Sequence, residues 1–210
     1  LSRGKLLGAA VALSRHLREA FPDPRMGVVL PASKGGVVAN LAVVLAGKIP
    51  GGLNFTSGKA ALQRAQEIAG LKTVISANAF TKRLPDFPWP EHVVQLDELL
   101  PGLKMKIFLW WMAAIILPAG ALIRLLGIPR HGDHADAILL FTSGSSGEPT
   151  VAVLTHRNVV GNVLQVLRLI DATRPALSTS PLPSVHRFAP PVTPSPPSPV
   201  APPISTSPLT

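Results

Sequence analysis

Strand-like segments alternate with helix-like segments along the first 171 residues, and this alternation limits the fold more than any other feature of the sequence. Short apolar runs bounded by turn residues are typical of buried strands, whereas apolar residues three and four positions apart are typical of helices. The predicted strands are 26–30, 72–76, 92–96, 137–141 and 151–154, with a loop and short strand at 49–55, and the predicted helices are 2–21, 33–46, 58–69 and 156–170. This order predicts an α/β fold with a doubly wound, mainly parallel sheet covered by helices on both faces.

Segment 104–128 does not fit the alternation and is interpreted as an apolar insertion. No residue from 107 to 123 is charged. A straight helix of that length reaches about 25 Å, short of the roughly 30 Å hydrocarbon core of a bilayer, and Pro118 and Gly120 interrupt it. The pattern therefore favours a segment that dips into one leaflet, with Trp and basic residues at the interface. A full span, a buried helix and a subunit contact are the alternatives.

The composition changes after Asp171, where the folded part is predicted to end. All 11 acidic residues lie at or before this position, whereas 172–210 holds 12 of the 23 prolines and many Ser and Thr residues. Each proline removes a backbone donor and fixes φ, so this tail is predicted to be disordered and partly polyproline II. Two other interpretations are an out-of-frame reading of coding DNA and a ligand for proline-binding modules.

Charge and cysteine content exclude several classes of function. The net charge of +9 indicates an anionic partner, such as a nucleotide phosphate or an anionic membrane surface. Nucleic acid is disfavoured because the basic residues are scattered and only 5% of the residues are aromatic. The absence of cysteine excludes disulfides, thiol nucleophiles and Cys-ligated metal centres.

The strongest motif is Leu-Leu-Phe-Thr-Ser-Gly-Ser-Ser-Gly-Glu-Pro at 139–149, followed by Leu-Thr-His-Arg-Asn at 154–158. A predicted strand leads into a loop of small residues, in which glycines allow positive φ and hydroxyl and amide groups can converge on one anion. The loop lacks the Gly-Lys-Ser/Thr of a Walker motif, the Gly-x-Gly-x-x-Gly of a dinucleotide site and the Gly-x-Ser-x-Gly of a hydrolase. Ordered patterns on both sides argue against a flexible linker.

These residues resemble the phosphate-binding motif of the adenylate-forming, AMP-binding enzymes. The stretches 27–31 and 51–56 are similar to the long-chain acyl-CoA and acyl-carrier-protein synthetases, above all to the synthetase half of the bifunctional acyl-acyl-carrier-protein synthetase/2-acylglycerophosphoethanolamine acyltransferases. The resemblance covers about residues 1–171 and implies a partial adenylation domain. The cofactor-binding residues that it implies are Thr142, Ser143, Gly144, Ser145, Ser146, Gly147 and Thr150.

The resemblance also implies a reaction, partners and a location. ATP with Mg²⁺ and a fatty acid would give an acyl-adenylate, and the thiol of coenzyme A or of acyl carrier protein would then take the acyl group. The loop would position the β and γ phosphates of ATP and stabilise their charge, without forming a covalent bond. The expected location is the cytoplasmic side of the inner membrane, peripheral or through a single hydrophobic insertion, with a cytoplasmic location as the alternative.

Two departures from the family pattern bear on activity. Thr150 and Val151 stand where the family usually has Lys and Gly, so a cation is missing beside the phosphates. The acid that binds Mg²⁺ and the C-terminal lid with its catalytic lysine have no counterpart, so no catalytic or metal-binding residue is assigned and the chain alone is expected to lack ligase activity. A non-catalytic membrane-associated remnant and a proline-rich interaction protein are the alternatives.

Other polar residues are interpreted as structural. Ser33 and Thr155 are predicted to cap helices, and Gly70 is predicted to end one. His156 is interpreted as a cap-region or packing residue in preference to a general base. Four residues, His131, Asp133, His134 and Asp136, could form a divalent metal site or belong to a solvated loop, and the solvated loop is favoured. The remaining candidates for caps or turns, without chemistry, are Lys34, Asn40 and Asn54.

Overall fold

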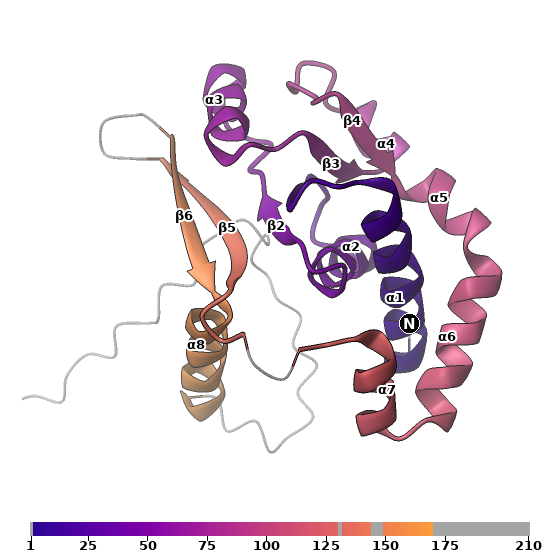
Figure 1. The fold of residues 1–210 in the computed structure, drawn as a ribbon. Coiled ribbons are helices and arrows are strands. Elements are labelled where there is room, and N and C mark those ends of the chain that lie inside the picture. Colours follow the sequence, from indigo (N-terminus) through magenta and orange to yellow (C-terminus); the bar gives the residue numbers. More distant parts are fainter. Residues whose placement is uncertain (1, 130–131, 144–148, 170–210) are drawn as a thin grey trace, which may run out of the picture.

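A computed structural model describes residues 2–129, 132–143 and 149–169 of the chain (Figure 1). Its strands are β1 (Arg25–Val28), β2 (Ile49–Gly52), β3 (Thr73–Ser76), β4 (His92–Gln95), β5 (Asp136–Ser143) and β6 (Pro149–Thr155). Its helices are α1 (Arg3–Ala20), α2 (Lys34–Leu45), α3 (Lys59–Ala69), α4 (Asn78–Thr81), α5 (Leu96–Gly102), α6 (Lys104–Ile116), α7 (Ala119–Leu126) and α8 (His156–Leu169).

The strands form one sheet in the order β4-β3-β1-β2-β5-β6. All neighbouring pairs are parallel except β5 and β6, which run antiparallel. The predicted α/β class and the mainly parallel sheet are confirmed, but the sheet is mixed at one edge. The reason is the short connection 144–148, because parallel neighbours need a crossover of a dozen residues or more and a hairpin does not.

Apolar side chains are buried on both faces of the sheet, as a doubly wound fold requires. On one face, Leu13 and Leu17 of α1 and Val43 of α2 pack against strand residues. On the other face, Leu62 of α3 and Leu139 of β5 lie in a second cluster. Alternate strand residues serve the two faces, because successive side chains of a strand point in opposite directions.

Helix boundaries follow the predicted capping signals. The Ser33 hydroxyl accepts a hydrogen bond from the Gly36 N–H at 3.2 Å, and Gly70 ends α3 with φ of 63° in the left-handed region. The Asn40 side chain donates to the Gly36 carbonyl at 2.8 Å, which makes it a local structural residue. The short helices α4 and α5 were not predicted, because neither is long enough to show a helical period.

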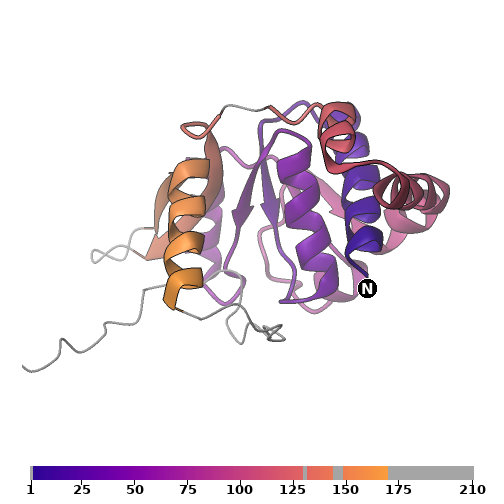
Figure 2. The same cartoon turned by 90° about the horizontal axis from the view of Figure 1, so that it is seen from below.

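The apolar insertion folds as two helices broken at the predicted proline. α6 ends at Ile116, and Pro118 precedes the first residue of α7. α1 lies between α2 and α6 (Figure 2). The contact with α6 is close at Gly8, where an added Cβ would lie 2.7 Å from the Ile107 carbonyl oxygen and 2.9 Å from the Trp111 nitrogen. The insertion therefore has one side attached to the domain.

Within the described ranges, no single helix is long and apolar enough to cross a membrane. The pair α5 and α6, bent by 71°, passes the same criterion together by length and composition.

One buried and one exposed cation, Lys48 and Arg18, anchor the loops at the amino ends of the strands. The Lys48 ammonium donates to the Phe21 and Asp23 carbonyl oxygens at 2.6 and 2.7 Å. Burial lowers the pKa of Lys48, partly offset by the charge of Asp23. The Arg18 guanidinium donates to the Leu45 carbonyl at 2.8 Å and so joins α1 to the end of α2.

Candidate functional site

The predicted phosphate loop connects the two strands of the β5–β6 hairpin. Thr142 pairs with Thr150, and Ser143 pairs with Pro149, at the end of the hairpin where the loop begins and ends. Four of the predicted residues, Gly144, Ser145, Ser146 and Gly147, lie outside the described residues. The structure therefore places Thr142, Ser143 and Thr150 and brings them together at the base of the loop.

The threonine pair presents hydroxyl groups at the loop entrance. Thr142 is half-buried, Thr150 is exposed, and the two residues lie directly opposite each other on the paired strands. Residues opposite each other on antiparallel strands project to the same face of the sheet. Hydroxyl groups can donate hydrogen bonds to phosphate oxygens, so this pair fits a phosphate ligand without supplying positive charge.

The stem of the hairpin is well supported by the second apolar cluster. Leu139 is fully buried, and Phe141 and Val151 pack against the cluster. An added Cβ at Gly51, in the neighbouring strand β2, would lie 3.2 Å from the Phe141 ring. Gly51 is thus a positioning residue. Its sequence signals were its place in the family-like stretch 51–56 and in a Pro-Gly-Gly run, and neither signal assigned it a role.

The residues after the hairpin have a structural role. The Thr155 hydroxyl accepts a hydrogen bond from the Asn158 N–H at 3.3 Å, and the Asn158 side-chain oxygen accepts from the Thr155 N–H at 3.1 Å. This reciprocal arrangement caps the start of α8. The His156 N–H donates to the Ala135 carbonyl at 3.0 Å, which agrees with the predicted cap-region position.

Other strand ends meet the same edge of the sheet as the hairpin loop. β1, β2, β3 and β5 are parallel, so their carboxyl ends share one edge, which is where open α/β sheets bind ligands. After β2, the Asn54 side-chain oxygen accepts hydrogen bonds from the Thr56 N–H and hydroxyl at 3.2 and 2.8 Å. This confirms Asn54 as a turn former.

The loop 131–136 contains the His and Asp residues of the alternative metal site. His131 lies outside the described residues, and the Asp133 carboxylate is 3.5 Å from the imidazole of His134, with both side chains exposed. In the described part of the chain, no group of three or more His, Cys, Asp or Glu residues could hold a metal ion. The Asp133 carbonyl accepts from the Arg157 N–H at 2.8 Å, so this loop helps to start α8.

Three comparisons with known proteins agree with this architecture. Nonribosomal peptide synthetase 32 of Fusarium pseudograminearum is 28% identical over 173 residues, which are 81% of this chain and 2% of that protein. The structure of VinN with 3-methylaspartate matches with a TM-score of 0.57 at 20% identity and covers 79% of this chain and 43% of that chain. The AMPPNP-bound form of the nonribosomal peptide synthetase FmoA3 (S1046A) matches with a TM-score of 0.56 at 23% identity and covers 79% of this chain and 16% of that chain.

The chain spans less than half the length of each of these relatives. The two solved structures share the fold of its α/β sheet. The family model described as AMP-binding enzyme matches residues 1–191, which is most of the chain and includes the whole β5–β6 hairpin. The chain therefore belongs to the AMP-binding enzyme family.

Proposed function

We propose that this chain is part of an adenylate-forming ligase and binds the triphosphate of ATP at the loop of the β5–β6 hairpin. The observation that supports this most is the pairing of Thr142 with Thr150 at the base of a Gly- and Ser-rich loop, at the carboxyl edge of the sheet. Ser143 and residues 144–147 complete the site. Mg²⁺ would accompany the nucleotide, but no residue of this chain is assigned to it.

The acid substrate is proposed to be a fatty acid, with coenzyme A or acyl carrier protein as the thiol acceptor and phospholipid acylation as the destination of the acyl group. The exposed apolar side chains of α6 and α7 support an apolar substrate class. An amino acid is the alternative, because FmoA3 was solved in an α-methyl-L-serine-AMP bound form and VinN with L-aspartate.

A second candidate function is a non-catalytic remnant of such a ligase. Thr150 favours it, because the family usually places a lysine there and a hydrogen bond to a charged group contributes about 1.5–3 kcal/mol. The absence of that cation would weaken ATP binding roughly ten- to a hundredfold. In this second case the loop binds phosphate weakly or not at all.

ATP binding by the full chain, measured by calorimetry, tests the nucleotide site. We expect the parent chain to bind ATP weakly. Thr150→Lys is expected to lower the dissociation constant about tenfold or more, because the new ammonium would reach the phosphates. Ala20→Lys on α1 adds the same charge at an exposed position on a helix that lies apart from the hairpin (Figure 1), and it is expected to leave the affinity unchanged. Equal tightening by both variants, or no binding by either, would contradict the proposed site.

Acid-dependent exchange between ATP and pyrophosphate separates the two candidate functions. We expect no exchange by the isolated chain, with fatty acids or with amino acids as the acid. Exchange by the parent chain would show that it retains adenylation chemistry and would exclude the remnant.

A further inference from the structure

The tip of the α6–α7 pair carries apolar side chains that no described residue covers. We call residues 115–125 the α6–α7 tip. Its exposed fractions are 60% for Ile115, 68% for Ile116, 43% for Ile123 and 52% for Leu125. α7 and the carboxyl end of α6 lie together at one end of the molecule (Figure 1). The tip therefore projects exposed apolar side chains from one end of the α/β domain.

The inner side of α6 is already occupied by α1. Besides the backbone contact at Gly8, the Arg15 guanidinium lies 4.6 Å from the centre of the Trp110 ring, and the Lys5 ammonium lies 5.3 Å from that of Trp111. These cation–π contacts hold both tryptophans on the α1 side. A helix that is apolar all round is stable only with an apolar neighbour on each side. Because α1 covers one side of α6, the other side requires a second apolar neighbour.

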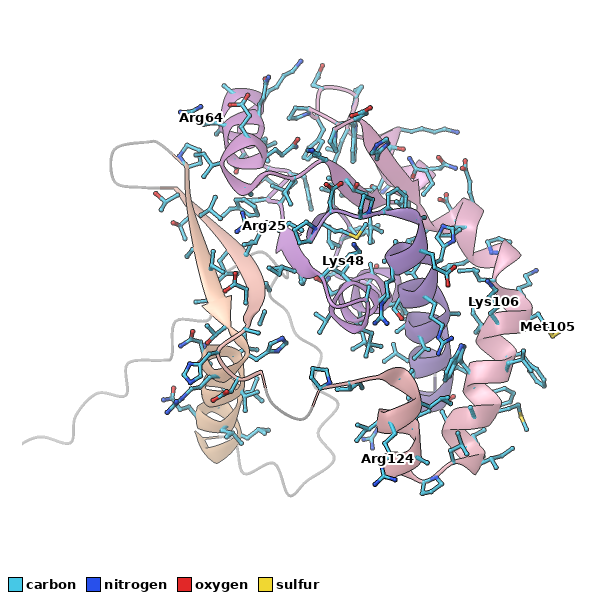
Figure 3. The ribbon with its side chains drawn as sticks, viewed as in Figure 1. Arg25, Lys48, Arg64, Met105, Lys106 and Arg124 are labelled. Carbon is cyan, nitrogen blue, oxygen red and sulfur yellow. The ribbon has the colours of Figure 1, made fainter. Side chains whose placement is uncertain are left out.

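The surroundings of the tip are positively charged. No Asp or Glu occurs from residue 99 to residue 132. The basic residue of the tip is Arg124 of α7, whereas Lys104 and Lys106 lie in the first turn of α6, toward the other end of that helix (Figure 3). Two copies of this surface would repel each other, whereas an anionic surface would be attracted.

A small cavity beside α7 gathers three arginines. Its volume is about 270 Å³, and it is lined by Ser14, Arg15, Arg18 and Glu19 of α1, Leu45 of α2, and residues 124–127. The salt bridges of the described residues are Arg64–Glu67 and Asp133–His134, so none of these arginines is paired with a carboxylate there. Arg18 uses two of its N–H groups on the Ala46 and Leu45 carbonyl oxygens, and the Glu19 carboxylate lines the same cavity. The remaining guanidinium N–H groups match the geometry of phosphate oxygens, and three arginines outweigh one carboxylate, so the cavity fits a phosphate monoester or diester.

We propose that the α6–α7 tip lies in the interfacial region of an anionic phospholipid bilayer and that the cavity of Arg15, Arg18 and Arg124 binds a lipid phosphate. Apolar residues of the tip enter the acyl boundary, and the cations meet the headgroups, as in other interfacial helices. This membrane surface is independent of the nucleotide loop and goes beyond the proposed ligase function.

Sedimentation of the full chain with vesicles tests this proposal. We expect binding to vesicles of equal parts phosphatidylglycerol and phosphatidylcholine, and little binding to phosphatidylcholine alone. The double variant Ile115→Gln/Ile116→Gln is expected to bind the anionic vesicles about tenfold more weakly or worse, because two apolar side chains no longer enter the bilayer. Arg124→Gln is expected to bind about fivefold more weakly.

Matched controls separate a specific surface from general stickiness. Val163→Gln/Leu164→Gln removes two similarly exposed apolar side chains from α8, and Arg64→Gln removes one positive charge from α3. Both are expected to bind like the parent chain, and circular dichroism of every variant should match the parent. The proposal is overturned if the controls lose as much binding as the tip variants. It is also overturned if the parent does not bind anionic vesicles, or if the tip variants only convert a dimer into a monomer.

Discussion

α6 and α8 both expose apolar side chains, but they differ in how those side chains are arranged. On α8 they form one stripe at i, i+3, i+4 and i+7, made up of Val160, Val163, Leu164 and Leu167. On α6 apolar side chains occur both against α1, where the tryptophans lie, and in solvent, where Met105, Phe108, Leu109, Ile115 and Ile116 are exposed. A single stripe is typical of a helix that packs on protein through one face, whereas an all-round apolar surface requires two apolar neighbours.

The comparison teaches that exposure alone does not define a binding surface. α6 is tightly joined to α1 on one side, so its outer side is a separate feature of a rigid block. α8 contacts the β5–β6 hairpin. Among the described residues of α8, the exposed apolar side chains all belong to this one stripe. The three experiments that follow test this difference in attachment.

The largest expected effect comes from a matched pair of glycine substitutions. Gly8→Ala on α1 is expected to destabilise the domain by about 2–3 kcal/mol, because its Cβ meets the α6 backbone and the two helices must separate. Gly161→Ala on α8 meets nothing within 4 Å and is expected to stabilise by roughly 0.5–1 kcal/mol through helix propensity. Urea unfolding measures both. If both substitutions changed the free energy of unfolding in the same direction, the proposed difference between α6 and α8 would be wrong.

A smaller effect is expected at Lys48, which anchors the block that carries α6. Lys48→Met leaves the Phe21 and Asp23 carbonyl oxygens without their donor and is expected to cost about 2 kcal/mol at neutral pH. Because burial lowers the pKa of Lys48, the unfolded chain binds the proton more tightly, and the stability of the parent rises with pH between the folded pKa and 10.5. The variant should lack that rise in a series of unfolding curves. A rise of equal size in the variant would assign the effect to another group.

The smallest effect is expected at the start of α8. Thr155→Ala removes the hydroxyl that accepts from the Asn158 N–H and is expected to cost about 1 kcal/mol. Hydrogen exchange should show faster opening of α8 with little change in α1, because few contacts join α8 to the rest of the domain. Ser33→Ala removes the corresponding cap of α2 and is the control, and its effect should spread through the well-packed block. Equal, uniform effects of the two variants would mean that α8 is as firmly attached as α2.

Much of the fold could be predicted because its signals are local. The apolar spacing of α1 and α2, the Ser33 cap and the left-handed Gly70 each depend on a few neighbouring residues. The break at Pro118 was equally local, because proline lacks the N–H that a continuous helix needs. For the candidate site, the motif identified Thr142, Ser143 and Thr150 as a group, whereas the contact between Gly51 and the Phe141 ring joins residues far apart in the chain and left no local pattern.

The amino-acid sequence by itself determined the α/β class, the helix ends and the family motif, because periodicity, capping and turn chemistry act over one or two turns of chain. Only the tertiary structure decided that Gly51 of β2 lies against the Phe141 ring and that α6 attaches to α1 through Gly8. These outcomes depend on pairing and close packing between distant segments. An apolar run has the same composition whichever neighbour it meets, so only the assembled core selects that neighbour.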